Sequence, residues 1–188
     1  MAEYPRGSEW RRWDLHTHTP GTVKNDCFAG GASIDARWDQ FYSDIVTYIG
    51  DGTDAAKAVV ALGITDYLSI ENYQRVVAEK RLPDSIKLLL PNVEMRIQPT
   101  ANDSPINIHF LFDPAFSSAI ESRFFSKLSF SYADTNFSAE KSELIRLGKT
   151  IDSSLSDEAA YKKGVEQFVP PLDAIKKVFE KVRNFVST

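Results

Sequence analysis

The chain has 188 residues, enough for one domain with a sizeable core but hardly for two. Apolar residues make up 43% and charged residues 26%, the balance of an ordinary globular protein, and the net charge of −4 excludes a general attraction to polyanions. A single cysteine, Cys27, excludes an internal disulfide, and no segment matches a signal peptide or a membrane span. We therefore expect a cytoplasmic protein without a membrane partner.

Strand-like and helix-like segments alternate through the first 115 residues. Apolar periodicity and turn residues set their bounds. The predicted segments are a strand over 10–19, a helix from Asp35 with an apolar stripe of Trp38, Phe41, Ile45 and Tyr48, a short helix over 54–62 with Gly63 as its stop, a strand over 64–68, a helix from 69 or 70 to 80, a strand over 86–97 and a strand over 106–113.

The remaining segments predict a strand and three helices. The strand covers 124–132, and the helices cover 138–147, 157–168 and 172–186. Alternating strands and helices indicate an α/β fold with parallel strands and outer helices. In such folds the chemistry lies at the carboxyl ends of the strands.

All three histidines lie in these strand-like segments or at their ends. His16 and His18 are two residues apart, so on a strand they point to the same side. Two charged imidazoles there would repel each other, which favours a neutral, metal-coordinating pair. Around His109 the alternation places Asn107, His109 and Asp113 on one face and the apolar residues on the other.

Two carboxylates, like the histidines, lie at the ends of strand-like segments. Glu94 ends an apolar run, where an unpaired charge is costly unless it is paired or bound to a cation. Asp66 ends the short strand before it. Histidine nitrogens with carboxylate oxygens suit zinc, manganese or iron, and argue against calcium and against a thiolate site.

Each of these residues alone has a plainer interpretation. A histidine such as His109 is usually a hydrogen-bonded core residue, Glu94 could pair with Arg96 or Arg75, and Asp66 could cap the following helix. The joint pattern favours a metal site, because every histidine falls at a predicted strand end.

Four motifs in order carry a resemblance to a known family. They are Asp14–Thr19 with its His-x-His, Ile64–Tyr67, Leu90–Glu94 and Ile106–His109. As a set they resemble the PHP family, named for phosphoesterase domains of bacterial DNA polymerases and histidinol phosphatase. Through Gly7–His16 and Leu62–Tyr67 the chain is closest to the PHP domains that begin large SMC or AAA-like ATPases.

The resemblance implies a partial, distorted (β/α) barrel of PHP type, with 1–188 as one domain. It implies two or three divalent metal ions (Zn, Mn or Fe) in the complete domain, held by His16, His18, Glu94 and His109. Asp66 is the predicted catalytic residue, as a further ligand or by orienting one. The activity implied is hydrolysis of a phosphate ester by metal-activated water.

The substrate implied is a phosphorylated small molecule or a nucleic acid, and the implied partner is a downstream ATPase domain. Phosphate requires positive side chains, and Arg11, Lys24 and Arg96 are the predicted phosphate-binding residues. The tryptophans Trp10, Trp13 and Trp38 are expected in the core rather than stacked on bases.

Departures from the family pattern leave two functions open. Tyr67 stands where the family usually has a ligand histidine, Asp26 is the nearest acidic residue for the ligand expected after His18, and no histidine follows His109. We therefore expect an N-terminal fragment that lacks the last strands of the barrel. The alternative to a phosphoesterase is a non-catalytic PHP-like binding or regulatory module of a larger ATPase. An amidohydrolase is disfavoured, because its bridging lysine and later histidine pair are missing.

Overall fold

The structure is a computed structural model that describes residues 11–24, 28, 33–50, 53–54, 58–101 and 104–186. Its elements, in chain order, are β1 (Arg12–His18), α1 (Ile34–Ile49), β2 (Val59–Tyr67), α2 (Glu71–Glu79), β3 (Leu88–Ala101), β4 (Ser104–Leu111), the 3₁₀ helix η1 (Pro114–Ala119), α3 (Ile120–Arg123), the 3₁₀ helix η2 (Phe125–Lys127), β5 (Ser129–Tyr132), β6 (Thr135–Ser138), α4 (Lys141–Ile151), α5 (Asp157–Gln167) and α6 (Leu172–Val186).

The main sheet has four strands in the order β1-β2-β3-β4 and curls into a half-barrel. β1, β2 and β3 are parallel, as predicted, but β4 runs antiparallel to β3. Only two residues separate β3 from β4. A parallel connection needs a crossover of a dozen or more residues, so this short link permits only a hairpin. The α/β class is therefore confirmed, and the expectation of parallel strands throughout is wrong.

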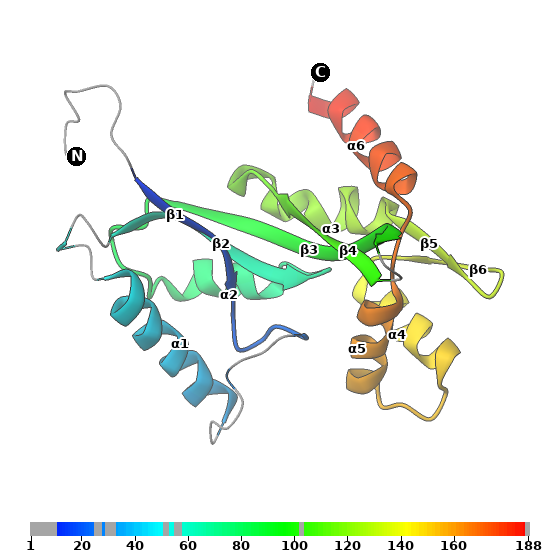
Figure 1. Ribbon diagram of the computed structural model, residues 1–188, viewed down its shortest axis with the longest axis horizontal. Coiled ribbons are helices and arrows are strands. Elements are labelled where there is room, and N and C mark those ends of the chain that lie inside the picture. The colour runs from blue at the N-terminus through cyan, green and yellow to red at the C-terminus, as the bar shows by residue number, and fades with distance from the viewer. Residues whose placement is uncertain are drawn as a thin grey trace.

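Two apolar clusters cover the sheet. In one, Trp38 and Phe41 of α1 pack with Leu62 and Ile64 of β2. The other joins β3 and β4 to the second half of the chain, and Val93 is fully buried in it. Figure 1 shows α1 at one end of the molecule and α4, α5 and α6 at the other. Among the described residues, no helix combines the length and apolarity needed to cross a bilayer.

The predicted helix over 54–62 is wrong where the structure describes it, because β2 begins at Val59. Residues 55–57 lie outside the described residues. A short apolar run fits a buried strand as well as a helix, and β2 is buried over nearly its whole length. Gly63 therefore does not end a helix. A Cβ there would lie 2.4 Å from the carbonyl oxygen of Leu15, so glycine lets β1 and β2 approach.

The predicted strand over 124–132 is correct only at its end. Residues 125–127 form η2, and Ser129–Tyr132 forms β5, which pairs with β6 in a separate two-stranded sheet. The turn of this hairpin has Ala133 and Asp134 at φ 46° and 60°, a left-handed pair that suits tight hairpins. No glycine marks this turn, and the sequence reasoning therefore missed β6.

Three further expectations are corrected. Asp35 was expected to start and cap helix α1, but the helix begins at Ile34 and is capped by Ser33, which accepts a hydrogen bond from Ala36 N. Tyr48 is 77% exposed, although it was expected in the apolar stripe. Trp13 is 62% exposed, whereas Trp38 is buried as predicted. Trp10 lies outside the described residues.

Candidate metal centre

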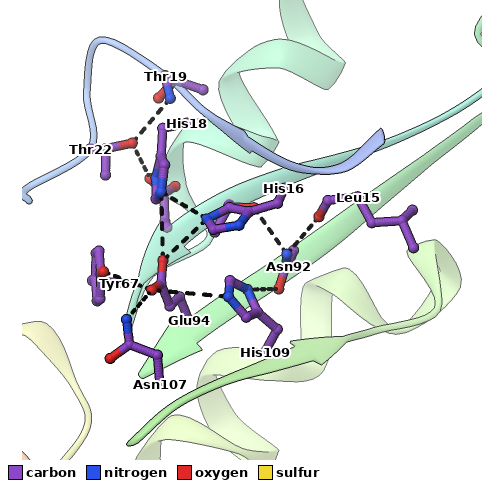
Figure 2. A network of polar contacts seen from close by, with 12 residues as sticks. Leu15, His16, His18, Thr19, Thr22, Tyr67, Asn92, Glu94, Asn107 and His109 are labelled. Carbon is purple, nitrogen blue, oxygen red and sulfur yellow. Dashed lines mark hydrogen bonds and ion pairs between the residues drawn. The ribbon is translucent and has the colours of Figure 1, made fainter. Parts of the chain in front are cut away.

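Three strands bring the predicted ligands together. β1 supplies His16 and His18, β3 supplies Glu94, and β4 supplies His109. The register pairs Glu94 with His109 across the β3–β4 hairpin and with Tyr67 across β2–β3. Because β1 and β2 end beside this point of β3, ligands from distant parts of the sequence meet at one place (Figure 2).

The imidazoles surround the carboxylate of Glu94. The Nε2 atoms of His16 and His18 are 3.0 Å apart, and each is 3.6 Å from Oε2 of Glu94. Nε2 of His109 is 4.0 Å from Oε1. Ligand atoms of His16, Glu94 and His109 lie within 4.8 Å of one another, a grouping that could hold a metal ion.

The two oxygens of Glu94 differ. Oε1 accepts hydrogen bonds of 2.7 Å from the hydroxyl of Tyr67 and of 2.7 Å from Nδ2 of Asn107. Oε2 is buried and accepts no hydrogen bond within the described part of the chain. A buried, unpartnered carboxylate oxygen is costly unless a cation or a proton meets it. Oε1 is thus held in place, while Oε2 faces His16 and His18 (Figure 2).

Burial favours the neutral form of two of the imidazoles. It lowers the pKa of His18, against the opposing effect of Glu94, and His16 lowers that pKa further. Burial also lowers the pKa of His109. A neutral imidazole has a free lone pair, which is the form that binds metals.

Asn92 orients His109 and ties the strands together. Its Oδ1 is 3.3 Å from Nδ1 of His109, and its Nδ2 donates to the carbonyl oxygen of Leu15 and to Oγ1 of Thr65. With Nδ1–H donated to Asn92, Nε2 of His109 is left as the lone-pair nitrogen toward Glu94. Sequence reasoning missed the roles of Asn92, Asn107 and the Tyr67 hydroxyl. Asn92 and Glu94 are two residues apart and therefore share one face of a strand, and this spacing could have indicated the role of Asn92.

The structure places Asp66 outside this group. Thr65 and Tyr67 face the centre, and Asp66 between them points to the other side of β2. There it is 2% exposed, and its Oδ1 accepts hydrogen bonds from Oγ1 of Thr22 (3.1 Å) and Nδ2 of Asn72 (2.8 Å). Burial raises the pKa of Asp66 to about 7. These contacts join the loop after β1 to the start of α2. They resemble the plainer interpretation of Asp66, which is a cap for the following helix.

Of the predicted phosphate-binding residues, Lys24 and Arg96 lie near the centre. Burial lowers the pKa of Lys24, and the charge of Arg96 lowers it further, while Glu166, 3.9 Å away, opposes the shift. The charge of Arg96 also lowers the pKa of Tyr67, against the larger opposing effects of burial and Glu94. Arg11 precedes His16 by five residues, roughly 16 Å along an extended strand, and is exposed.

Asp113, which the strand alternation placed on the same face as His109, has another position. The carboxylate of Asp113 accepts a hydrogen bond of 2.8 Å from Ala115 N and caps η1, rather than joining His109 in the centre. Asp26 lies outside the described residues.

In comparisons with known proteins, no family model, curated protein or solved structure matched this chain significantly. The PHP resemblance therefore remains a prediction from the sequence motifs. The residues of the centre provide the chemical argument. Nitrogen ligands with one carboxylate, half-open to solvent because the His16 side chain is 53% exposed, suit a divalent metal that a substrate can reach.

Proposed function

We propose that this chain is a metal-dependent phosphoesterase that hydrolyses a phosphate ester in a nucleotide or nucleic acid. The observation that carries the proposal is Oε2 of Glu94, a buried oxygen without a hydrogen bond that faces two imidazoles 3.6 Å away. A cation at this point would satisfy the oxygen. We further propose that the curled sheet is part of a PHP-type barrel.

The residues present fit a divalent metal such as Zn, Mn or Fe, and a PHP-type site would hold two or three such ions. His16, His18, Glu94 and His109 would hold it. A bound metal supplies Lewis-acid chemistry toward a phosphoryl oxygen and toward the attacking water. The other residues hold the ligands still, since Tyr67 and Asn107 fix Glu94 while Asn92 fixes His109.

Lys24 and Arg96 are the proposed phosphate-binding residues. Both are basic side chains beside the centre, and the charge of Arg96 lowers the pKa of Lys24. A guanidinium can grip a phosphate with two parallel hydrogen bonds, whereas an ammonium acts as a point charge. Together they would hold the substrate so that its phosphorus faces the ligands.

Tyr67 favours a second candidate function, a non-catalytic binding module attached to a downstream ATPase domain. Its hydroxyl donates to Glu94 at the place where the PHP family usually has a ligand histidine. Burial and the neighbouring Glu94 raise the pKa of Tyr67 to about 12, so the phenol stays protonated at neutral pH. A protonated phenol is a poor replacement for an imidazole as a metal ligand.

Metal content and hydrolysis, measured on the same preparation, test the proposal. We expect the purified chain to retain Mn²⁺ or Zn²⁺ by elemental analysis and to hydrolyse p-nitrophenyl phosphate when Mn²⁺ is added. His18→Ala should abolish both, whereas Gln40→Ala on the exposed face of α1 should change neither. Retained metal without turnover would support the binding module. A chain that retains no metal would contradict the phosphoesterase.

A further inference from the structure

A second cavity lies beyond the metal centre along β3. It has a volume of about 460 Å³ and lies between Gln98, strand β5 and the start of α6. Three lysines line it, Lys127, Lys177 and Lys181, against a single carboxylate from Asp173. We call this cavity the lysine groove.

The lysines of this groove are free to bind an anion. Lys24, Lys141, Lys149 and Lys176 are each paired with a carboxylate. In contrast, no hydrogen bond or ion pair joins the side chain of Lys127, Lys177 or Lys181 to another described residue. Asp173 is 3.5 Å from Lys176, which partly neutralises the one acid of the groove. This unbalanced positive charge is local, because the whole chain has a net charge of −4.

The polar face of β3 connects the groove to the metal centre. Val93, Met95 and Ile97 are buried in the core cluster. Residues alternate along a strand, so Glu94, Arg96 and Gln98 share the opposite face. Gln98 in the groove follows the ligand Glu94 by four positions, roughly 13 Å along the strand.

Positive charge continues along this path. Arg96 lies midway between Glu94 and Gln98. The charges of Arg96 and Lys162 both lower the pKa of Lys24, against the opposing effect of Glu166. Arg96 therefore adds a positive charge on the face of β3 that joins the metal centre to the lysine groove. The distance between the centre and the groove is too long for a single phosphate group but suits a chain of phosphates.

We propose that the lysine groove binds the phosphate backbone of single-stranded nucleic acid, which then runs along β3 toward the metal centre. The substrate class this implies, an oligonucleotide rather than a phosphorylated small molecule, rests on the proposed function. Positively charged grooves that track the backbone are the general means of binding single strands. The groove has the volume of a small-ligand pocket, about 300–1,000 Å³, and is too small to enclose a duplex.

Binding can be measured separately from hydrolysis. We would follow the fluorescence anisotropy of a labelled oligothymidylate of about ten nucleotides, in EDTA so that no metal contributes. The variant is the triple substitution Lys127→Gln, Lys177→Gln and Lys181→Gln. We expect it to weaken binding about tenfold or more, and to reduce the slope of log K against log salt by about two, because each lost phosphate contact removes about 0.7.

A second triple substitution with the same change in net charge is the control. Lys80→Gln, Lys87→Gln and Lys163→Gln should leave oligothymidylate binding within about twofold of the unsubstituted chain. Equal losses in the two triple variants would overturn the proposal, since the effect would then come from net charge. Equal binding of a duplex of the same length, or full displacement of the oligonucleotide by millimolar inorganic phosphate, would also overturn it.

Hydrolysis of p-nitrophenyl phosphate separates this proposal from the proposed function. The triple variant of the lysine groove should keep the turnover of this small substrate, because no lysine of the groove touches the metal ligands. A chain that hydrolyses nothing, yet loses oligonucleotide binding only in this variant, would support the groove and contradict the phosphoesterase. A chain that hydrolyses p-nitrophenyl phosphate but binds no oligonucleotide would support the phosphoesterase and contradict the groove.

Discussion

At the scale of single residues, Glu94 links the fold to the proposed chemistry. It is buried in the sheet, and two donors occupy one of its oxygens while the other faces His16 and His18. Hydrogen bonds from groups around a ligand fix its orientation and tune its affinity for metal. Tyr67 and Asn107 therefore decide which oxygen of Glu94 is available.

Removing the Tyr67 hydroxyl tests this division of roles. We expect Tyr67→Phe to weaken metal binding about tenfold or more, because Oε1 loses a donor and Glu94 can rotate. Calorimetric titration with Zn²⁺ or Mn²⁺ measures the change. Tyr73→Phe is a matched control, since Tyr73 is also buried but belongs to the α1–β2 cluster away from Glu94. Equal affinities of Tyr67→Phe and the unsubstituted chain would rule out a positioning role for this hydroxyl.

At the scale of elements, α4 and α5 pack through two glycines. A Cβ on Gly148 would lie 1.9 Å from the carbonyl oxygen of Ala160, and a Cβ on Gly164 would lie 1.9 Å from that of Leu144. Both contacts are with backbone, which cannot move aside as a flexible side chain can. The close approach of these helices thus depends on the absence of side chains at both positions.

This packing predicts the effect of the smallest possible substitution. Gly164→Ala should lower the free energy of unfolding by about 1–3 kcal/mol, because the helices must separate to admit the methyl group. This loss should outweigh the gain in helix propensity, about 1 kcal/mol. Urea denaturation followed by circular dichroism measures it. The neighbouring exposed Lys163→Ala should change stability by no more than about 0.5 kcal/mol, and an equally stable Gly164→Ala chain would contradict the packing.

At the scale of the whole molecule, the metal centre joins strands that are distant in sequence. His16 and His18 come from β1, Glu94 from β3 and His109 from β4, at the opposite edge of the sheet from β1. The unfolded chain has no such arrangement. A metal bound by these residues would therefore stabilise the folded sheet as a unit.

The resulting prediction concerns thermal stability. Free metal at about 100 times its dissociation constant should stabilise the chain by about 2.7 kcal/mol, visible as a higher melting temperature. His109→Ala should remove most of this metal-dependent increase, because β4 then contributes no ligand. Thermal melts with and without Zn²⁺, with Mg²⁺ as a hard-cation control, measure the effect. A His109→Ala chain that responds to Zn²⁺ as fully as the original would show that His109 takes no part.

The sequence by itself determined the features that depend on local pattern. Two histidines at a spacing of two had to share a face of a strand, and the apolar periodicity of α2, α5 and α6 was strong enough to place those helices within about three residues. The α/β class followed from the alternation of strands and helices, and the meeting of His16, Glu94 and His109 followed from strand ends that carry polar residues. These inferences needed only the geometry of a single strand or helix.

Tertiary structure alone decided the rest. The direction of β4 depended on the length of its hairpin link, and the segment at Val59 became a strand because it pairs with β1 on one edge and β3 on the other and is buried between them. The β2–β3 register pairs Asp66 with Val93, so the Asp66 side chain lies on the face of the sheet opposite to Glu94. No local sequence pattern reveals this register. The same register places Tyr67 against Glu94. Contacts between residues far apart in sequence determine such details, so only the folded chain shows them.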